Sequence, residues 1–386
     1  MSCPEARPSR SWLGPCALLA CLAACAKEGG AVKPACPSPQ VVTGTASAES
    51  WASAKASAAP VNELPDEFTV PSPQPLANLA WEDGIYITRD GLGLYATYIP
   101  GDMLSAVEQA SSPLDFYKYQ RGNLIGQDLS NPIAGHDTPW LHADIAYARR
   151  PSTSEPFRCW SLTGLSDRYY NRGAAVGVLD AADPSRFDLF AYTDDSGGPT
   201  KIELLRDVPR DPTAPGSALP ANVGGNAYRQ DNPHLERPEP AQPGSLVLLF
   251  ESTDQPATHP GRNIWSSQSG DGGSTWTDPT QVTTVDSGND EQQPHLFGDG
   301  STFWLYFTAA NPADGKLAIY RARQEIPGSW DAWGPRQLVV SAGTSLGVGE
   351  PSLTSRGDLS FVLVVENTQG TATDRYDADP WFLPHR

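Results

Sequence analysis

Residues 263–285 read Asn-Ile-Trp-Ser-Ser-Gln-Ser-Gly-Asp-Gly-Gly-Ser-Thr-Trp-Thr-Asp-Pro-Thr-Gln-Val-Thr-Thr-Val. From Ser269 onward this segment has the form Ser-x-Asp-x-Gly-x-Thr-Trp, which is a turn-forming pattern. The side chains of Ser269 and Asp271 can bond backbone N–H groups of the same tight loop. Gly273 can take a positive φ without strain, and the ring of Trp276 can bury itself between neighbouring sheets. The segment therefore strongly indicates the architecture of the chain and gives little information about its chemistry.

The five positions Ser269, Asp271, Gly273, Thr275 and Trp276 resemble the Asp box, or BNR repeat, of sialidase-type β-propellers. The resemblance implies a propeller in which this turn lies on an outer hairpin, away from the central face where ligands bind. In this interpretation the five residues are structural, and calcium at the turn is not implied.

The chain after residue 230 repeats one order of motifs. Pro-His-Leu at 233–235 recurs 61 residues later at 294–296, and the strand residue Ile264 recurs 55 residues later as Ile319. A third copy begins at Glu350. Short strands rich in β-branched and aromatic residues follow each start. This order also resembles the repeats of TolB-like propellers.

These patterns predict an all-β fold, a β-propeller of five or six four-stranded blades. The earlier copies are looser and include an insert, residues 100–139, with a helix expected near Met103. We expect three regions in the 386 residues. Residues 1–24 form a lipoprotein signal peptide, residues 25–80 hold the lipidated cysteine and a disordered Ala/Ser/Pro-rich tether, and residues 81–386 form the propeller.

The N-terminus has the features of an export signal. Two arginines precede a short apolar run that ends in Leu-Ala-Ala-Cys at Cys25. This resembles a bacterial lipobox, which implies lipidation of Cys25 and, with Ala26 following, a place in the outer membrane. An ordinary secretory signal is the alternative. Cys36 and Cys159 are able to pair in an oxidising compartment, and the sequence leaves that pairing open.

The charge and the motifs limit the classes of partner. The formal net charge of −18 makes nucleic acid an unlikely partner. No cofactor motif is present. The cluster from His136 to Asp144 matches no compact metal-site spacing, so no metal is expected. We expect a monomer that contacts the membrane through its lipid.

The repeat starts carry the candidate site, because the first strand of each propeller blade lines the central channel. Carboxylates there could act as general acid and base in glycoside hydrolysis, or could simply fix the loops between blades. The candidate catalytic residues are Asp83, Asp231, Glu291 and Glu350. The candidate ligand-binding residues are His234, His295 and Arg262.

We expect the channel face to bind a glycan or an envelope protein without catalysis. The alternative is a glycoside hydrolase, sialidase-like or arabinanase-like, that uses paired channel carboxylates. A purely structural scaffold is a third possibility. No arginine triad of the sialidase kind is recognisable, so no sialidase catalytic residue is assigned.

Overall fold

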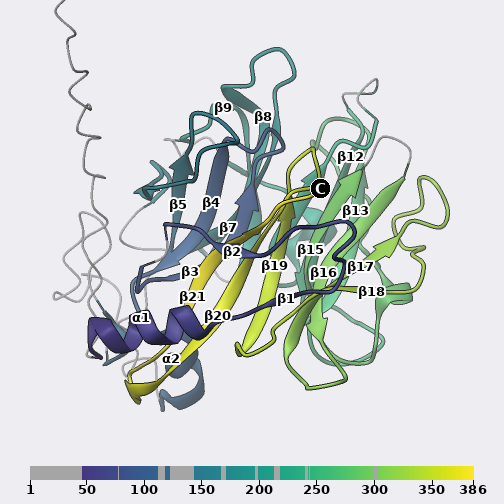
Figure 1. Ribbon diagram of the computed structural model, residues 1–386. Helices are drawn as coiled ribbons and strands as arrows, with labels where there is room; N and C mark the ends of the chain where they lie inside the picture. The colour runs from purple at the N-terminus through teal and green to yellow at the C-terminus, as the bar shows by residue number, and fades with distance from the viewer. Residues whose placement is uncertain are drawn as a thin grey trace, which may run out of the picture. The chain divides into compact units, whose positions relative to one another are not determined.

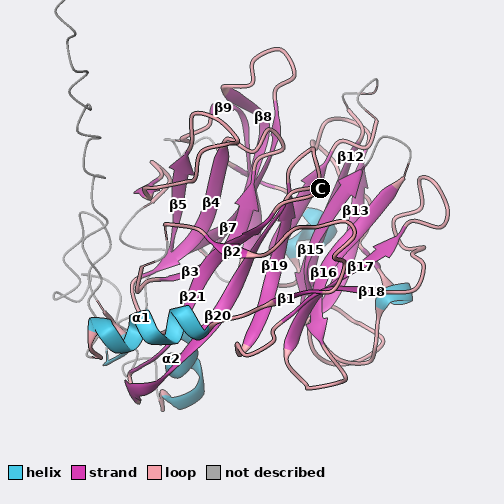
Figure 2. Cartoon of the chain, viewed as in Figure 1, coloured by secondary structure: helices cyan, strands magenta, loops and turns pink. Residues whose placement is uncertain are grey.

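A computed structural model gives the fold, and strands make up most of the regular secondary structure that it describes (Figure 2). The described residues lie in one compact unit within 36–386. They are 46–76, 78–111, 118–121, 143–166, 171–195, 199–212, 218–239, 242, 244–298 and 302–386. The cluster from His136 to His142 therefore lies outside them, as do Cys25 and Cys36. Within these residues no helix has the length and apolar character needed to cross a membrane.

Five four-stranded antiparallel blades form the propeller, so the lower of the two expected numbers is right. The first strand of each blade contacts the first strands of the neighbouring blades, and these five strands line the centre (Figure 1). The strands are, blade by blade, β3 (Trp81–Ile87), β4 (Gly93–Ile99), β5 (Asp144–Arg149) and β6 (Ser161–Leu162); β7 (Arg172–Leu179), β8 (Arg186–Asp194), β9 (Lys201–Pro209) and β10 (Leu219–Pro220); β11 (Asp231–Glu236), β12 (Leu246–Ser252), β13 (Asn263–Ser269) and β14 (Thr280–Gln281); β15 (Glu291–Gly298), β16 (Phe303–Ala310), β17 (Leu317–Arg323) and β18 (Gln337–Ser341); β19 (Gly347–Leu353), β20 (Leu359–Thr371), β21 (Asp374–Leu383) and β2 (Ser72–Pro73).

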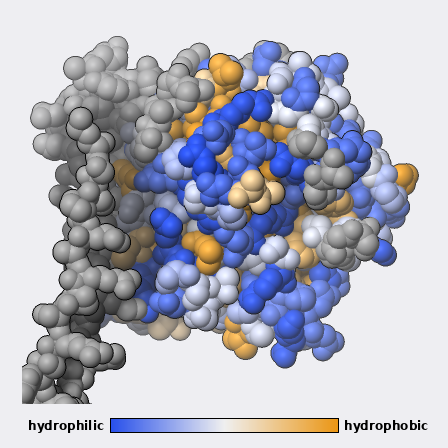
Figure 3. All heavy atoms as spheres, turned by 90° about the horizontal axis from the view of Figure 1, so that it is seen from above, coloured by the Kyte–Doolittle hydropathy of each residue, from blue (hydrophilic) through white to orange (hydrophobic). Residues whose placement is uncertain are grey.

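Each blade buries apolar side chains on both faces, which explains the continuous apolar runs in the middle strands. In β12, Leu248 and Phe250 pack with the second blade, whereas Val247 and Leu249 pack with the fourth. This alternation is the period of two expected of a strand. The face shown in Figure 3 is mostly hydrophilic, with apolar residues in scattered groups.

The turn at Ser269 has the hydrogen bonds that its sequence predicts. Ser269 Oγ accepts from the backbone N–H of Gly273 at 2.8 Å. Asp271 Oδ1 accepts from the N–H groups of Ser274 and Thr275, both at 2.9 Å. Trp276 is half-buried and packs on the core shared by the second and third blades.

The N-terminal segment corrects the expected domain boundary, because ordered structure begins well before Trp81. Helix α1 (Ala48–Ser57) lies across β20 and β21 (Figure 1). The two-residue strand β1 (Val61–Asn62) pairs with β18 at the edge of the fourth blade, and β2 supplies the outer strand of the fifth. This N-terminal segment has no core of its own, because its strands complete the edges of existing sheets. Its sequence therefore lacks apolar periodicity.

Short helices fill the remaining connections. Helix α2 (Met103–Gln109) follows β4, close to the expected position, and its N-cap Asp102 accepts from the backbone N–H of Ser105. Two 3-10 helices, η3 (Val223–Asn226) and η4 (Thr283–Val285), precede β11 and β15.

Candidate active site

A bulge recurs at one position in all five central strands. The pairing register shifts there in β3, β7, β11, β15 and β19. In each bulge one residue has a positive φ between 42° and 60°, and these residues are Gly84, Ala174, Asn232, Gln293 and Glu350. Such a backbone is uncommon for residues other than glycine, and it concentrates at functional sites. The repeated bulge changes the direction of the side chains on the central strands.

One pocket of about 330 Å³ beside these bulges is lined by Asp195, which follows β8, and by four carboxyl groups on strands. They are Asp83 on β3, Asp231 on β11, Glu251 on β12 and Glu350 on β19. Asp231 and Glu251 are direct cross-strand partners, which places their Cβ atoms roughly 5 Å apart. The pocket volume lies in the range of small-molecule sites, about 300–1,000 Å³.

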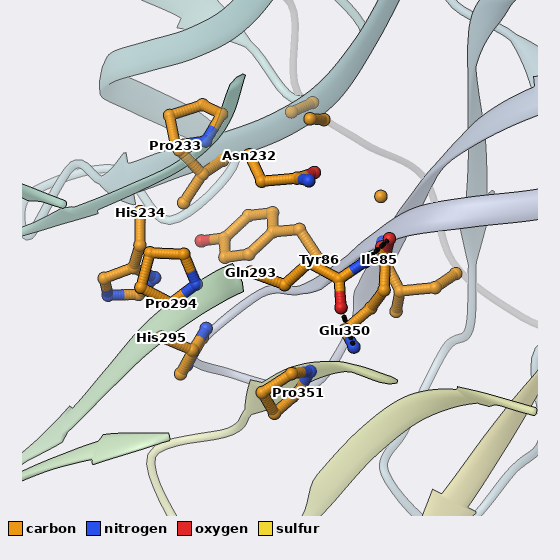
Figure 4. A pocket seen from close by; sticks show the side chains of 14 residues that line it. Ile85, Tyr86, Asn232, Pro233, His234, Gln293, Pro294, His295, Glu350 and Pro351 are labelled. Carbon is orange, nitrogen blue, oxygen red and sulfur yellow. Dashed lines mark hydrogen bonds between the residues drawn. The ribbon is translucent and has the colours of Figure 1, made fainter. Parts of the chain in front are cut away.

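Glu350 is held on both of its carboxylate oxygens. Oε2 accepts from the backbone N–H of Ile85 at 2.8 Å, and Oε1 accepts from Gln293 Nε2 at 2.7 Å (Figure 4). Glu251 is held in the same way, because Oε2 accepts from the backbone N–H of Gln293 at 2.8 Å and Oε1 from Arg262 Nη1 at 3.2 Å. Gln293 therefore joins the two buried glutamates and fixes their positions.

Asp83 and Asp231 keep one carboxylate oxygen each for the pocket. Asp83 Oδ2 accepts from Trp81 Nε1 at 2.7 Å, and Asp231 Oδ1 accepts from the backbone N–H of Asn232 at 3.1 Å. The second oxygen of each has no hydrogen-bond partner among the residues that the structure describes. Both side chains are half-buried, so both are open to a ligand.

The pKa of each of these four strand carboxyl groups is raised, and burial is the largest cause for each. Burial raises the pKa of Asp83 to about 6, and the charge of Asp231 adds to the rise. Burial raises the pKa of Glu251 to about 7 and that of Glu350 well above its usual range. The pKa of Asp231 is also raised by burial, while the charges of Arg262 and of a second arginine oppose that rise.

The two predicted histidines do not line this pocket. His234 and His295 are buried, their ring centroids are 4.1 Å apart, and His295 Nε2 accepts from the backbone N–H of Leu353 at 3.0 Å. They line a separate cavity of about 30 Å³ on the channel axis, which has room for about one or two waters (Figure 4). Of the three predicted ligand-binding residues, only Arg262 lines the larger pocket, with 44% of its side chain exposed.

Glu291, one of the four candidate catalytic residues, lies outside this group of carboxylates. It is the first residue of β15 and does not line the pocket. Its Oε1 accepts from Ser287 Oγ, and its neighbours are His259 and Arg336. The repeat places Gln292, not Glu291, at the position equivalent to Asp231, because each directly precedes its bulge.

Glu251 and Gln293 belong to the site, and sequence reasoning missed both. Glu251 lies near the end of the apolar second strand β12, and only its pairing with Asp231 brings it to the pocket. The signal available in the sequence is its place as the first charged residue after the run 246–250. Gln293 was missed because its side chain is uncharged, and the sequence analysis considered only charged and histidine side chains at the repeat starts.

Comparison with known proteins supports the fold. No protein-family model and no curated protein matches the chain. The solved catalytic domain of the Coprinopsis cinerea GH62 alpha-L-arabinofuranosidase is 10% identical, with a TM-score of 0.50 over 81% of this chain and 95% of that chain. A second structure, named as a glycoside hydrolase, is 11% identical, with a TM-score of 0.50 over 87% and 95%. At these identities the likeness shows a shared β-propeller fold.

One functional expectation is corrected here. We expected a channel face that binds a partner without catalysis. The two similar propellers are instead named as glycoside hydrolases. The open pair of carboxyl groups with raised pKa values also differs from acids tied up in loop hydrogen bonds. Both findings favour the alternative expectation, a glycoside hydrolase.

Proposed function

We propose that this protein is a glycoside hydrolase that cleaves a glycan in the pocket formed by Asp83, Asp231, Glu251 and Glu350. The observation that carries the proposal is that Asp83 and Asp231 line one pocket of about 330 Å³, each with one carboxylate oxygen that has no hydrogen-bond partner among the described residues. Glycosidic cleavage needs one carboxylic acid that gives a proton and one carboxylate that acts as base or nucleophile.

The environments of Asp83 and Asp231 favour different roles. Burial together with the charge of Asp231 raises the pKa of Asp83 to about 6, which suits a general acid. The nearby positive charge of Arg262 favours the ionised form of Asp231. Asp83 would protonate the leaving oxygen, and Asp231 would act as base or nucleophile. Glu350 holds the backbone of β3 two residues after Asp83, and Glu251 holds the backbone of the β15 bulge at Gln293.

The pocket also limits the substrate class. Five carboxyl groups and two arginines, Arg172 and Arg262, line it, so a negatively charged sugar would be repelled and a neutral glycan is expected. A similar propeller is named as an alpha-L-arabinofuranosidase, which makes arabinofuranosides the first substrates to test.

The test is release of reducing sugar from a panel of neutral plant and bacterial polysaccharides. We expect Asp231→Asn to lower kcat by about 10²–10⁴-fold with the fold intact. Asp254→Asn, on the loop after β12 but outside the pocket, serves as the matched control and should keep full activity. Activity should fall as pH rises through about 6, because Asp83 then loses its proton. Equal loss in both variants, or wild-type protein inactive on every neutral glycan, would contradict the proposal.

We further propose export and a lipid anchor at Cys25, which lies outside the described residues. The support is the charged start, the short apolar run and the Leu-Ala-Ala-Cys sequence, which together indicate a lipoprotein of the outer membrane. We also propose that the third blade is an Asp-box repeat, and the hydrogen bonds of the turn at Ser269 support this. The protein would act as an anchored monomer on glycans outside the cytoplasm.

A further inference from the structure

Three possible metal ligands meet at the junction of the third and fourth blades, outside the carboxylate pocket. His259 lies in the loop between β12 and β13, Asp286 follows η4, and Glu291 begins β15. One ligand atom from each lies within 4.8 Å of the others. His259 Nε2 is 2.8 Å from Asp286 Oδ1 and 4.0 Å from Glu291 Oε2.

The hydrogen bond of His259 Nδ1 orients the ring so that Nε2 faces this cluster. Its Nδ1 is 2.8 Å from the backbone oxygen of Pro260. A carbonyl oxygen only accepts, so Nδ1 carries the hydrogen and Nε2 of the neutral ring has a free lone pair. Metal-binding histidines are usually oriented by such a bond from the other ring nitrogen. Asp286 is fixed as well, because Gly288 N–H donates to its Oδ1 and Thr258 Oγ1 to its Oδ2, both at 2.7 Å.

Glu291 supplies the independent sign that a ligand belongs here. It is 2% exposed, and its Oε1 accepts from Ser287 Oγ and faces Arg336 Nη1 at 3.5 Å. Its Oε2 is buried and has no hydrogen-bond partner within the described part of the chain. A buried carboxylate oxygen without a partner is costly. It points toward the same space as His259 Nε2.

We propose that His259 Nε2, Asp286 Oδ1 and Glu291 Oε2 bind a divalent transition metal, with Zn²⁺ as the first candidate. An imidazole with two carboxylates is a donor set that suits Zn²⁺. Ligand atoms around a tetrahedral ion with bonds of about 2.1 Å are roughly 3.4 Å apart, and the two separations from His259 lie on either side of that value. Three protein ligands leave a fourth position for water, and His259 and Asp286, each 13% exposed, give access.

The site would brace the backbone that carries Arg262. Glu291 N–H donates to Arg262 O at 3.0 Å, and Arg262 N–H donates to Asp290 Oδ1 at 2.9 Å. A metal at His259, Asp286 and Glu291 would therefore join the β12–β13 loop to β15 beside the pocket. The role is structural and does not depend on the proposed hydrolase activity.

The test is Zn²⁺ titration of the purified full chain after EDTA treatment and dialysis, by calorimetry and by thermal unfolding. We expect one equivalent with a micromolar or lower Kd, and a Tm rise of about 3–6 °C at 100-fold excess over Kd. Glu291→Gln and His259→Gln should each weaken binding at least tenfold and remove the Tm rise. Asp278→Asn is the matched control, an exposed aspartate of the same blade, and should bind as wild type does.

A second measurement on the wild-type protein keeps the proposal testable if a variant does not fold. Crystals soaked in Zn²⁺ should show an anomalous peak about 2.0–2.2 Å from the three named atoms. The proposal is overturned by absence of stoichiometric binding, by binding that survives both substitutions, or by Ca²⁺ binding more tightly than Zn²⁺. An ion pair between protonated His259 and Asp286 would then explain the contact.

Discussion

Replacing Lys55 by Met should destabilise the protein, because this side chain of α1 pairs with two buried aspartates of the fifth blade. Lys55 Nζ lies 2.6 Å from Asp377 Oδ2 and 2.8 Å from Asp379 Oδ1. Both aspartates are at most 3% exposed, whereas Lys55 is 24% exposed. After the substitution Asp377 keeps only Arg121 Nη1, at 3.2 Å, and Asp379 keeps no cation at salt-bridge distance within the described residues.

Removing one partner of a buried ion pair costs about 3–5 kcal/mol, and the partial exposure of Lys55 places this case at the lower end, about 3 kcal/mol. For a chain of this size that corresponds to a Tm drop of about 5–10 °C. Chemical denaturation and calorimetry measure both quantities. The loss should be smaller at pH 5 than at pH 8, because burial raises the pKa of Asp377 to about 7 and the uncompensated acid becomes neutral at low pH.

Lys316→Met is the control for the loss of a lysine. Its Nζ donates to the backbone oxygens of Gly343 and Ser345 and has no carboxylate partner within the described residues, so its replacement should cost less. Asp379→Asn in the Lys55→Met background should recover part of the stability, as a double-mutant cycle would show. A loss below about 0.5 kcal/mol, or one equally large at both pH values, would refute the reasoning.

Other predictions concern backbone, pH and anchoring. Gly84→Ala should destabilise by about 2–3 kcal/mol, because φ is +57° and a Cβ would lie 2.3 Å from a threonine hydroxyl; Gly288→Ala, at φ +81° with open space, should cost only about 1 kcal/mol, and equal losses in urea unfolding would be inconsistent with this. Stability should fall between pH 5 and pH 8, since burial raises the pKa values of Glu251 and Asp377 to about 7; raised carboxyl groups stabilise below their unfolded pKa and lose this as pH rises through the folded value. A Tm that rises over this interval would contradict the assignment. Cys25→Ser should move the protein from the membrane fraction to the soluble fraction, and an unchanged distribution on immunoblots would argue against lipidation.

The propeller could be predicted because its repeats carry the information several times. Pro-His-Leu at 233–235 and 294–296 marks the third and fourth central strands, and the structure has β11 and β15 there. The closure of the ring could not be predicted in the same way. Strands β1 and β2 have two residues each and gain their stability from the edges of blades that lie more than 250 residues away in sequence. No local pattern encodes such a pairing.

Part of the site could also be predicted from the repeats. Asp83 and Asp231 directly precede the bulges of their central strands, and Glu350 lies within the bulge of its own, so the shared ring brings the three together. Glu291 lies outside the pocket because it precedes Gln292, the residue before the bulge, by one position. A shift of one residue places a side chain on the other face of the strand. That shift depends on the left-handed residue Gln293, and a positive φ at a glutamine has no sequence signature.

The most direct measurement compares two substrates of Asp83→Asn: a glycoside with a poor leaving group and an aryl glycoside with an activated one. If Asp83 is the acid and Asp231 the base or nucleophile, kcat/KM should fall by about 10²–10⁴-fold on the first and by less than tenfold on the second. An equal loss on both substrates, or no loss on either, would contradict the assignment of Asp83 and with it the carboxylate pair on which the proposed activity rests.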